Sequence, residues 1–180
     1  MAEDPDDAEL ERIAREVLAE EDSILVPFEL IGDFDRPPGS GPAASLLSQI
    51  QAMGVAERVK LALRGNKDAR QILIRDGNRL IRRFVLQNPR VSDGEVVAVA
   101  RNRTAGEELL RLIADKREWM KNYQVRLSLA TNPKTPLPIA LRQVGTLGER
   151  DLSQLAKSRN VPQAVATAAR RLVLEKREKR

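Results

Sequence analysis

A dense set of arginine and lysine side chains between residues 64 and 90 is the first feature of this sequence that can do chemistry. Neighbouring helices would place several of these cations on one face, where they can contact phosphates or carboxylates with a salt-dependent affinity. Only Phe84 is interleaved with them, whereas proteins that bind single strands stack bases on several aromatic rings. A solvated helix face without a ligand is the alternative. The set comprises Arg64, Lys67, Arg70, Arg75, Arg79, Arg82, Arg83 and Arg90.

A second cluster surrounds the single tryptophan. Trp119 and Tyr123 are four residues apart, so one helix would place both on the same side. Tryptophan, tyrosine and arginine dominate protein-binding hot spots, and core packing of Trp119 is the alternative. The two clusters together supply the candidate partner-binding residues: Arg79, Arg82, Arg83, Arg90, Lys116, Trp119, Lys121, Tyr123 and Arg126.

The composition argues against catalysis. The chain contains no cysteine and no histidine, which excludes disulfides, zinc and haem sites that use these ligands, and nucleophiles activated by histidine. The nearest approach to a carboxylate pair is Asp115 with Glu118, and no spaced aspartate cluster indicates a magnesium or calcium site. We therefore predict no catalytic residue, no metal site, no cofactor and no enzymatic activity.

Charge divides the chain at a linker rich in proline and glycine. Residues 1–40 hold 13 acidic and 3 basic side chains, whereas residues 41–180 hold 13 acidic and 28 basic ones. Such asymmetry is typical of a protein that binds a polyanion or an acidic partner, or that masks its own basic surface. The predicted parts are an acidic helix at 1–22, an extended apolar segment and linker at 23–42, a helical body at 43–176 and a charged tail at 177–180. One expectation is an intramolecular contact between the body and the acidic arm, by which we mean the acidic helix and the extended segment before the linker.

Short amphipathic helices are predicted for most of the chain. Leu10, Ile13, Val17 and Leu18 form one apolar stripe. Residues 23–35 read instead as a strand-like run, which would lie across the body as a strap or serve as a short motif for another protein. From residue 43 onward the helices are about ten residues long, too short to be stable alone, so they must pack on one another. Their starts have capping signals at Ser92 with Glu95, Thr104 with Glu107, and Thr135 before Pro136.

A phrase that contains Asn-Pro recurs where helices end. Residues 85–92 match residues 129–136, which places Asn88 and Asn132 44 positions apart. Repetition at this period is typical of stacked helical repeats. Asparagine bonds free backbone groups at a turn and the following proline sets the exit angle. The residues predicted to hold these turns are Asn88, Pro89, Asn132, Pro133, Asn160 and Pro162.

These residues carry a resemblance to a known family. Residues 85–92 and 129–136, with Asp115, Trp119, Val125 and Arg126 before the second copy, resemble the repeat of leucine-rich-repeat-variant proteins, which are similar in style to HEAT and armadillo repeats. The resemblance covers about residues 55–172. It implies an all-α fold, namely a right-handed α-solenoid of short stacked helices, and a non-catalytic binding role. Some relatives carry a cysteine-bound cluster, which this chain cannot hold.

The expected function is a protein–protein interaction scaffold or adaptor that binds an acidic or peptide-like partner on its basic or concave face. The alternative is a nucleic-acid-binding protein that uses its basic body and masks it with the acidic arm. The chain contains no apolar run near 18 residues, and its acidic start differs from the basic start of a signal peptide. We therefore expect a cytoplasmic protein with no membrane partner.

Overall fold

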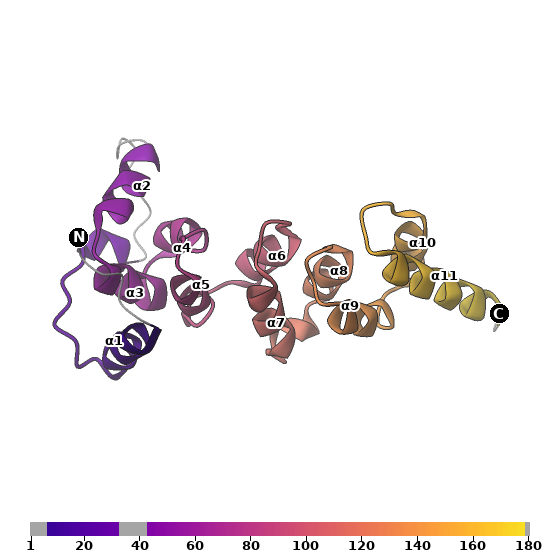
Figure 1. Ribbon diagram of the computed structural model, residues 1–180, viewed down its shortest axis with the longest axis horizontal. Coiled ribbons are helices and arrows are strands. Elements are labelled where there is room, and N and C mark those ends of the chain that lie inside the picture. The colour runs from indigo at the N-terminus through magenta and orange to yellow at the C-terminus, as the bar shows by residue number, and fades with distance from the viewer. Residues whose placement is uncertain (1–6, 33–42, 179–180) are drawn as a thin grey trace. The chain divides into compact units, whose positions relative to one another are not determined.

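The computed structural model describes residues 7–32 and 43–178, and all regular structure in these ranges is helical (Figure 1). The predicted all-α class is thereby confirmed. The α-helices are α1 (Asp7–Ala19), α2 (Ala43–Ala52), α3 (Val55–Arg64), α4 (Lys67–Leu73), α5 (Arg79–Val85), α6 (Asp93–Arg101), α7 (Glu107–Asp115), α8 (Tyr123–Thr131), α9 (Leu137–Val144), α10 (Glu149–Lys157) and α11 (Gln163–Glu178). Two short 3-10 helices are η1 (Phe28–Leu30) and η2 (Trp119–Lys121).

The chain divides into two compact units, residues 1–91 and 92–180. The first unit contains α1 to α5 and η1, and the second contains α6 to α11 and η2. The boundary therefore lies inside the stretch 43–176 that the sequence predicts as one domain. The acidic arm belongs to the first unit, together with α2 to α5 of the predicted body.

The first unit buries one side of α1 against α3 and α5. Leu10 and Val17 of the predicted stripe are fully buried and share a core with Ile81 and Phe84. Leu18, at the edge of the stripe, is half exposed. Helix α1 is too short to be stable by itself, so this apolar contact is what keeps it folded on the unit.

The strand-like run read in the sequence at residues 23–35 forms no strand over its described part, where the only regular structure is the 3-10 helix η1. Residues 33–35 lie outside the described ranges. Pro27 cannot donate a hydrogen bond to a neighbouring strand. The carbonyls of Glu29 and Leu30 accept hydrogen bonds from Asn66, at the start of α4, rather than from a sheet. Residues 20–32, called the strap from here on, follow α1 in an irregular extended path.

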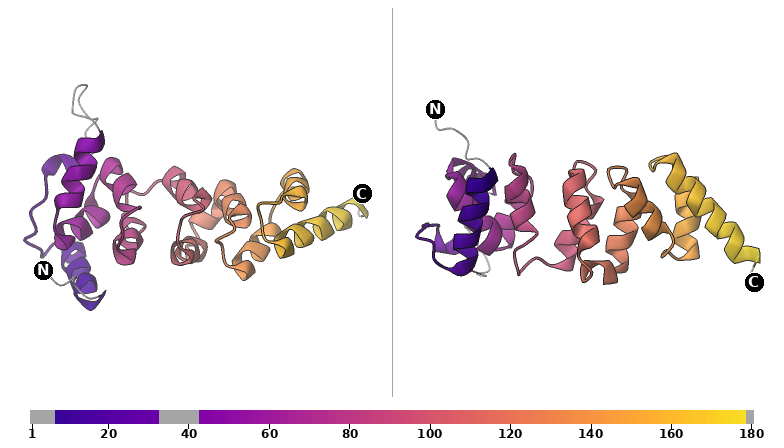
Figure 2. Two further views of the ribbon diagram at one scale, coloured as in Figure 1. Left: turned by 45° about the horizontal axis from the view of Figure 1, so that its top comes forward. Right: turned by 60° about the horizontal axis from the view of Figure 1, so that its bottom comes forward.

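The second unit consists of three helical hairpins, α6/α7, α8/α9 and α10/α11 (Figure 2). Helix α6 also packs on α8, and α9 on α11, so neighbouring hairpins stack on one another. The core between the last two hairpins is aliphatic and includes Val144, Leu152, Leu155, Val165 and Val173. Burial of these side chains explains how helices of eight or nine residues remain folded.

The two units share one arrangement at the ends of α5 and α8. The Asn88 side chain donates to the carbonyls of Ala62 (3.0 Å) and Gly65 (3.2 Å), where α3 ends. Asn132 does the same at the end of α6, donating to Ala100 (2.8 Å) and Asn102 (3.0 Å). Each Oδ1 accepts from the N–H two residues further on, at 2.9 Å. The 44-residue repeat in the sequence is therefore a repeat of hydrogen bonding.

The helix starts differ in part from their predicted caps. Ser92 and Glu95 form the predicted capping box, with Ser92 N–H donating to the Glu95 carboxylate at 3.0 Å. The box predicted at Thr104 is wrong, because its hydroxyl donates to Asn102 and Gly106 occupies the cap position of α7. Thr135 does not cap α9 either, since Pro136 occupies the cap position without a side-chain bond.

Candidate binding surface

The acidic arm lies against basic side chains of α3 and α5 within the first unit. This is the intramolecular contact that the charge asymmetry predicts. Because α3 and α5 pack on each other and both contact α1, their cations meet the arm along one surface. The four pairs are Asp7 with Arg79, Glu11 with Arg83, Asp22 with Lys60 and Glu20 with Arg64.

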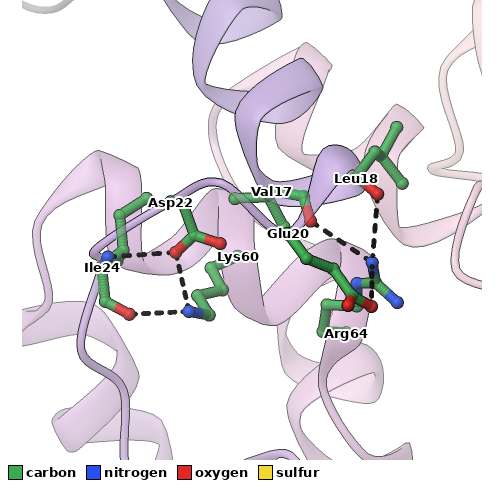
Figure 3. A network of polar contacts seen from close by, with 7 residues as sticks. All are labelled: Val17, Leu18, Glu20, Asp22, Ile24, Lys60 and Arg64. Atoms are coloured by element: carbon green, nitrogen blue, oxygen red, sulfur yellow. Dashed lines mark hydrogen bonds and ion pairs between the residues drawn. The ribbon is translucent and has the colours of Figure 1, made fainter.

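Lys60 holds the strap just after α1 (Figure 3). Its Nζ donates to Asp22 Oδ1 and to the Ile24 carbonyl, both at 2.7 Å. Only 6% of the Asp22 side chain is exposed. Burial alone would raise the pKa of Asp22, but the hydrogen bonds from Lys60 and the Ile24 N–H outweigh it, so the pKa lies below its usual value of 3.8. The Asp22 carboxylate is therefore ionised at neutral pH.

Arg64 holds the end of α1. Its Nη2 donates to the carbonyls of Val17 and Leu18, each at 3.3 Å, and pairs with Glu20 at 3.3 Å (Figure 3). The last turn of α1 contains no basic residue of its own. Arg64 therefore supplies the positive charge that favours a helix C-terminus, and it donates to carbonyls of the last turn of α1.

The two pairs on α5 are more open to solvent than the pair of Asp22 and Lys60. The side chains of Arg79 and Asp7 are 60% and 55% exposed, and those of Arg83 and Glu11 are 28% and 41% exposed. Exposed ion pairs contribute only about 0–1 kcal/mol each. Another carboxylate can therefore replace Asp7 or Glu11 at little energetic cost, while the apolar contacts of α1 keep the arm in place.

The far end of the strap crosses two turns of the first unit. Asn66 N–H donates to the Leu30 carbonyl at 2.7 Å, and its side chain donates to Glu29 at the same distance. Arg90, two residues after Asn88, donates to the Ile31 carbonyl. The strap is thus held mainly through its backbone, by groups at the ends of helices.

A cavity of about 360 Å³ lies between α1, the strap, α3 and the Asn88 turn. The arm contributes Glu20 and Asp22 to its wall, and the body contributes Lys60, Arg64 and Arg90. Because Glu20, Asp22, Lys60 and Arg64 already pair across it, an anionic ligand would enter by replacing an arm carboxylate.

Two arginines predicted to bind a partner instead hold backbone within their own unit. Arg82 donates to the Asp76 carbonyl at 2.6 Å, and Arg126 donates to the Met120 carbonyl at 3.4 Å. In each case the acceptor lies six residues earlier, so the 44-residue repeat extends to this contact. Arg70, part of the dense basic set, is buried and donates to the Gly65 carbonyl.

The residues around Trp119 do not form an open recognition spot. Trp119 is 9% exposed, as the core alternative predicts, and Lys116 Nζ lies 4.3 Å from the centre of its ring. Burial lowers the pKa of Lys116. Lys121 is exposed and lies 3.6 Å from Glu118.

Tyr123 joins the starts of α8 and α10. Its hydroxyl donates to Asp151 and accepts from the Gly148 N–H at 3.1 Å. The hydrogen bond to the Asp151 carboxylate raises the pKa of Tyr123. Tyr123 therefore fixes the stacking of two hairpins.

The third predicted turn is held differently from the first two. Ser158 stands where α10 ends, and its Oγ accepts from the Asn160 N–H at 3.2 Å. The structure therefore places Ser158, rather than the exposed Asn160, where Asn88 and Asn132 stand in the other turns. Pro162 directly precedes α11, and its carbonyl accepts from Val165 and Ala166.

Sequence reasoning missed Lys60 and Asn66 as residues that hold the strap, each through two hydrogen bonds of 2.7 Å. Lys60 lies four residues before Arg64, and this spacing places both on one side of a helix. That signal was present in the sequence. Asn66 is only a weak echo of the asparagine turns in the sequence, and it also caps α4 by accepting from the Ala69 N–H.

The described ranges hold no cluster of three or more acidic residues that could bind a metal ion. Within the same ranges, no helix is both long and apolar enough to cross a membrane.

Comparison with models of protein families, with curated proteins and with solved structures finds no match to this chain.

Proposed function

We propose that this protein is a non-catalytic interaction scaffold that binds acidic, extended segments of a partner protein. The observation that supports it is the arm itself: an acidic helix and strap lie on the basic surface of α3 and α5 through four acid–base pairs. This surface therefore already has the chemistry needed to hold an acidic segment.

The arm acts in this proposal as an internal competitor. Its tethered carboxylates have a high effective concentration at the basic surface. A partner must therefore exceed the arm in affinity, or take over the exposed positions of Asp7 and Glu11 while the apolar side of α1 stays docked. The arm would therefore lower the partner's apparent affinity. The reduction factor equals the fraction of molecules in which the arm leaves these cations free.

The right-handed α-solenoid implied by the family resemblance remains part of the proposal. Its support is the recurrence of one hydrogen-bonding arrangement in both units, at Asn88 and at Asn132. Repeated units that contact only their neighbours form extended binding surfaces.

The test uses full-length protein in which arm carboxylates are neutralised as Asp7→Asn, Glu11→Gln and Asp22→Asn. We expect a fluorescently labelled acidic peptide to bind this variant about tenfold more tightly than wild type, because the cations are released. The measurement is fluorescence anisotropy over a salt series, with duplex DNA and RNA of equal charge as competing probes.

The matched control is Glu16→Gln, Glu21→Gln and Glu29→Gln, which removes the same charge from the same arm without touching the four pairs. An equal increase in peptide affinity in both variants would show that only net charge matters, and it would contradict masking of the basic surface by the arm. Tighter binding of nucleic acid than of peptide by the neutralised variant would favour the nucleic-acid alternative instead.

A further inference from the structure

The three hairpins of the second unit place their turns on one edge. The starts of α6 and α8 are joined by Asn122, whose side chain donates to Asp93 at 2.9 Å, and Tyr123 joins the starts of α8 and α10. At the opposite end, Asn132 bonds the end of α6. Helices α6, α8 and α10 therefore run parallel, and turns 102–106, 132–136 and 158–162 lie on the same edge (Figure 2). We call this edge the turn edge.

Each turn of this edge presents an exposed cation. Arg103, Lys134 and Arg159 lie one in each turn, and Lys157 is the last residue of α10. All four are exposed, and in the part of the chain that the structure describes none has an ion pair or side-chain hydrogen bond.

Few acidic groups oppose these cations. The first turn of α7 contains Glu107 and Glu108, and Glu107 already pairs with Arg111. The first turns of α9 and α11 contain no acidic residue. Helices α7 and α9 also begin at this edge without a side-chain cap, so their free N–H groups add partial positive charge.

In the first unit, a segment of the chain itself lies across the corresponding turns. There the turns at Asn66 and at Asn88 are crossed by the strap, through the carbonyls of Glu29, Leu30 and Ile31. Arg90, which bonds Ile31, follows Asn88 by two residues, as Lys134 follows Asn132. Lys134 therefore occupies the position of Arg90, and its side chain bonds no segment among the described residues.

We infer that the turn edge of the second unit binds an extended acidic segment of a partner protein, over turns that correspond to those the strap crosses in the first unit. The inference rests on the proposed function and names the surface for it.

The experiment compares two full-length triple variants with wild type. The edge variant is Arg103→Gln, Lys134→Gln and Arg159→Gln. The control variant is Arg117→Gln, Arg142→Gln and Arg150→Gln, which removes three exposed cations of the same unit away from these turns. All six side chains are exposed, so circular dichroism and thermal unfolding should show both variants folded like wild type.

The probes are a labelled peptide with the sequence of residues 20–32, the same peptide with its acids replaced by amides, and a single-stranded RNA of 12 nucleotides. The edge variant should bind the acidic peptide about tenfold more weakly, the sum expected for three exposed ion pairs, and the control variant less than about twofold. The amide peptide lacks the acidic groups, so it should bind wild type and both variants equally weakly.

Equal losses in both triple variants would overturn the inference, because they would show attraction by net charge alone. Tighter binding of RNA, lost in the edge variant, would also overturn it by assigning the edge to nucleic acid. Acidic peptide binding that responds to neutralising the arm but not to the edge variant would reject the edge and leave the proposed function standing. Absence of peptide binding in wild type and in the arm-neutralised protein would reject the proposed function itself.

Discussion

Glu20 adopts a left-handed backbone conformation, with φ of 61°, and its carboxylate pairs with Arg64 at 3.3 Å. It is the residue at which α1 ends and the strap begins. The Glu20 N–H bonds the Val17 carbonyl and the Glu21 N–H bonds the Glu16 carbonyl, a helix ending in which glycine is usual. The chain therefore accepts a strained residue at the bend of the arm, and that residue contacts the cation that holds α1.

Replacing Glu20 with glycine should relieve this strain. A residue other than glycine in the left-handed region costs about 1–2 kcal/mol, whereas an exposed ion pair contributes about 0–1 kcal/mol. We expect Glu20→Gly to be more stable than Glu20→Ala by about 1 kcal/mol in urea unfolding, because both lose the carboxylate and only alanine keeps the strain. A less stable glycine variant would show that the bend is not strained.

Removing one buried side chain of α1 should loosen the whole arm. Leu10 is fully buried in the first unit's core, so Leu10→Ala should lower the free energy of unfolding by about 2–5 kcal/mol. Leu25→Ala is the matched control, because Leu25 is 87% exposed and should change stability by less than about 0.5 kcal/mol. Equal effects of the two changes in chemical denaturation would contradict the docking of α1.

The buried asparagines of the turns should contribute more to stability than the exposed Asn160. Asn88 and Asn132 are buried and each donates to two carbonyls, so Asn88→Ala or Asn132→Ala should destabilise the protein by about 1–3 kcal/mol. Aspartate should be worse than alanine at either position, since it brings a negative charge against two carbonyl oxygens. Asn160→Ala, at an exposed position, should be nearly neutral, and a large effect there would restore Asn160 as a turn residue.

The Asp22–Lys60 pair should appear in the pH dependence of stability. The folded pKa of Asp22 is lowered, so its contribution is fully present above the unfolded pKa of about 3.9 and is lost as pH falls through the folded pKa. Asp22→Asn should therefore lower stability at pH 7, and its stability profile should fall less than that of wild type below about pH 4. Glu21→Gln, at an exposed neighbour, serves as the control, and parallel profiles for wild type and Asp22→Asn would contradict the pair.

Local spacing determined much of this protein. The 3.6-residue period of Leu10 and Val17, the capping pair of Ser92 and Glu95, and the Asn-Pro repeat at Asn88 and Asn132 each rest on residues a few positions apart. These features therefore predicted helices, several of their bounds and the repeated turns. The excess of acid in the arm and of base in the body predicted their contact. Net charge is counted from the sequence alone and needs no knowledge of which side chains pair.

Only the tertiary structure decided which groups meet. Asp22 and Lys60 are 38 residues apart, and Asp7 and Arg79 are 72 apart; no periodicity relates them, because their pairing depends on how α1 packs on α3 and α5. Packing likewise buried Arg70, although it looks in the sequence like any other cation of the basic set. An ionic contact on a surface is set by long-range apolar packing, whereas a helix and its end are set by the local chain.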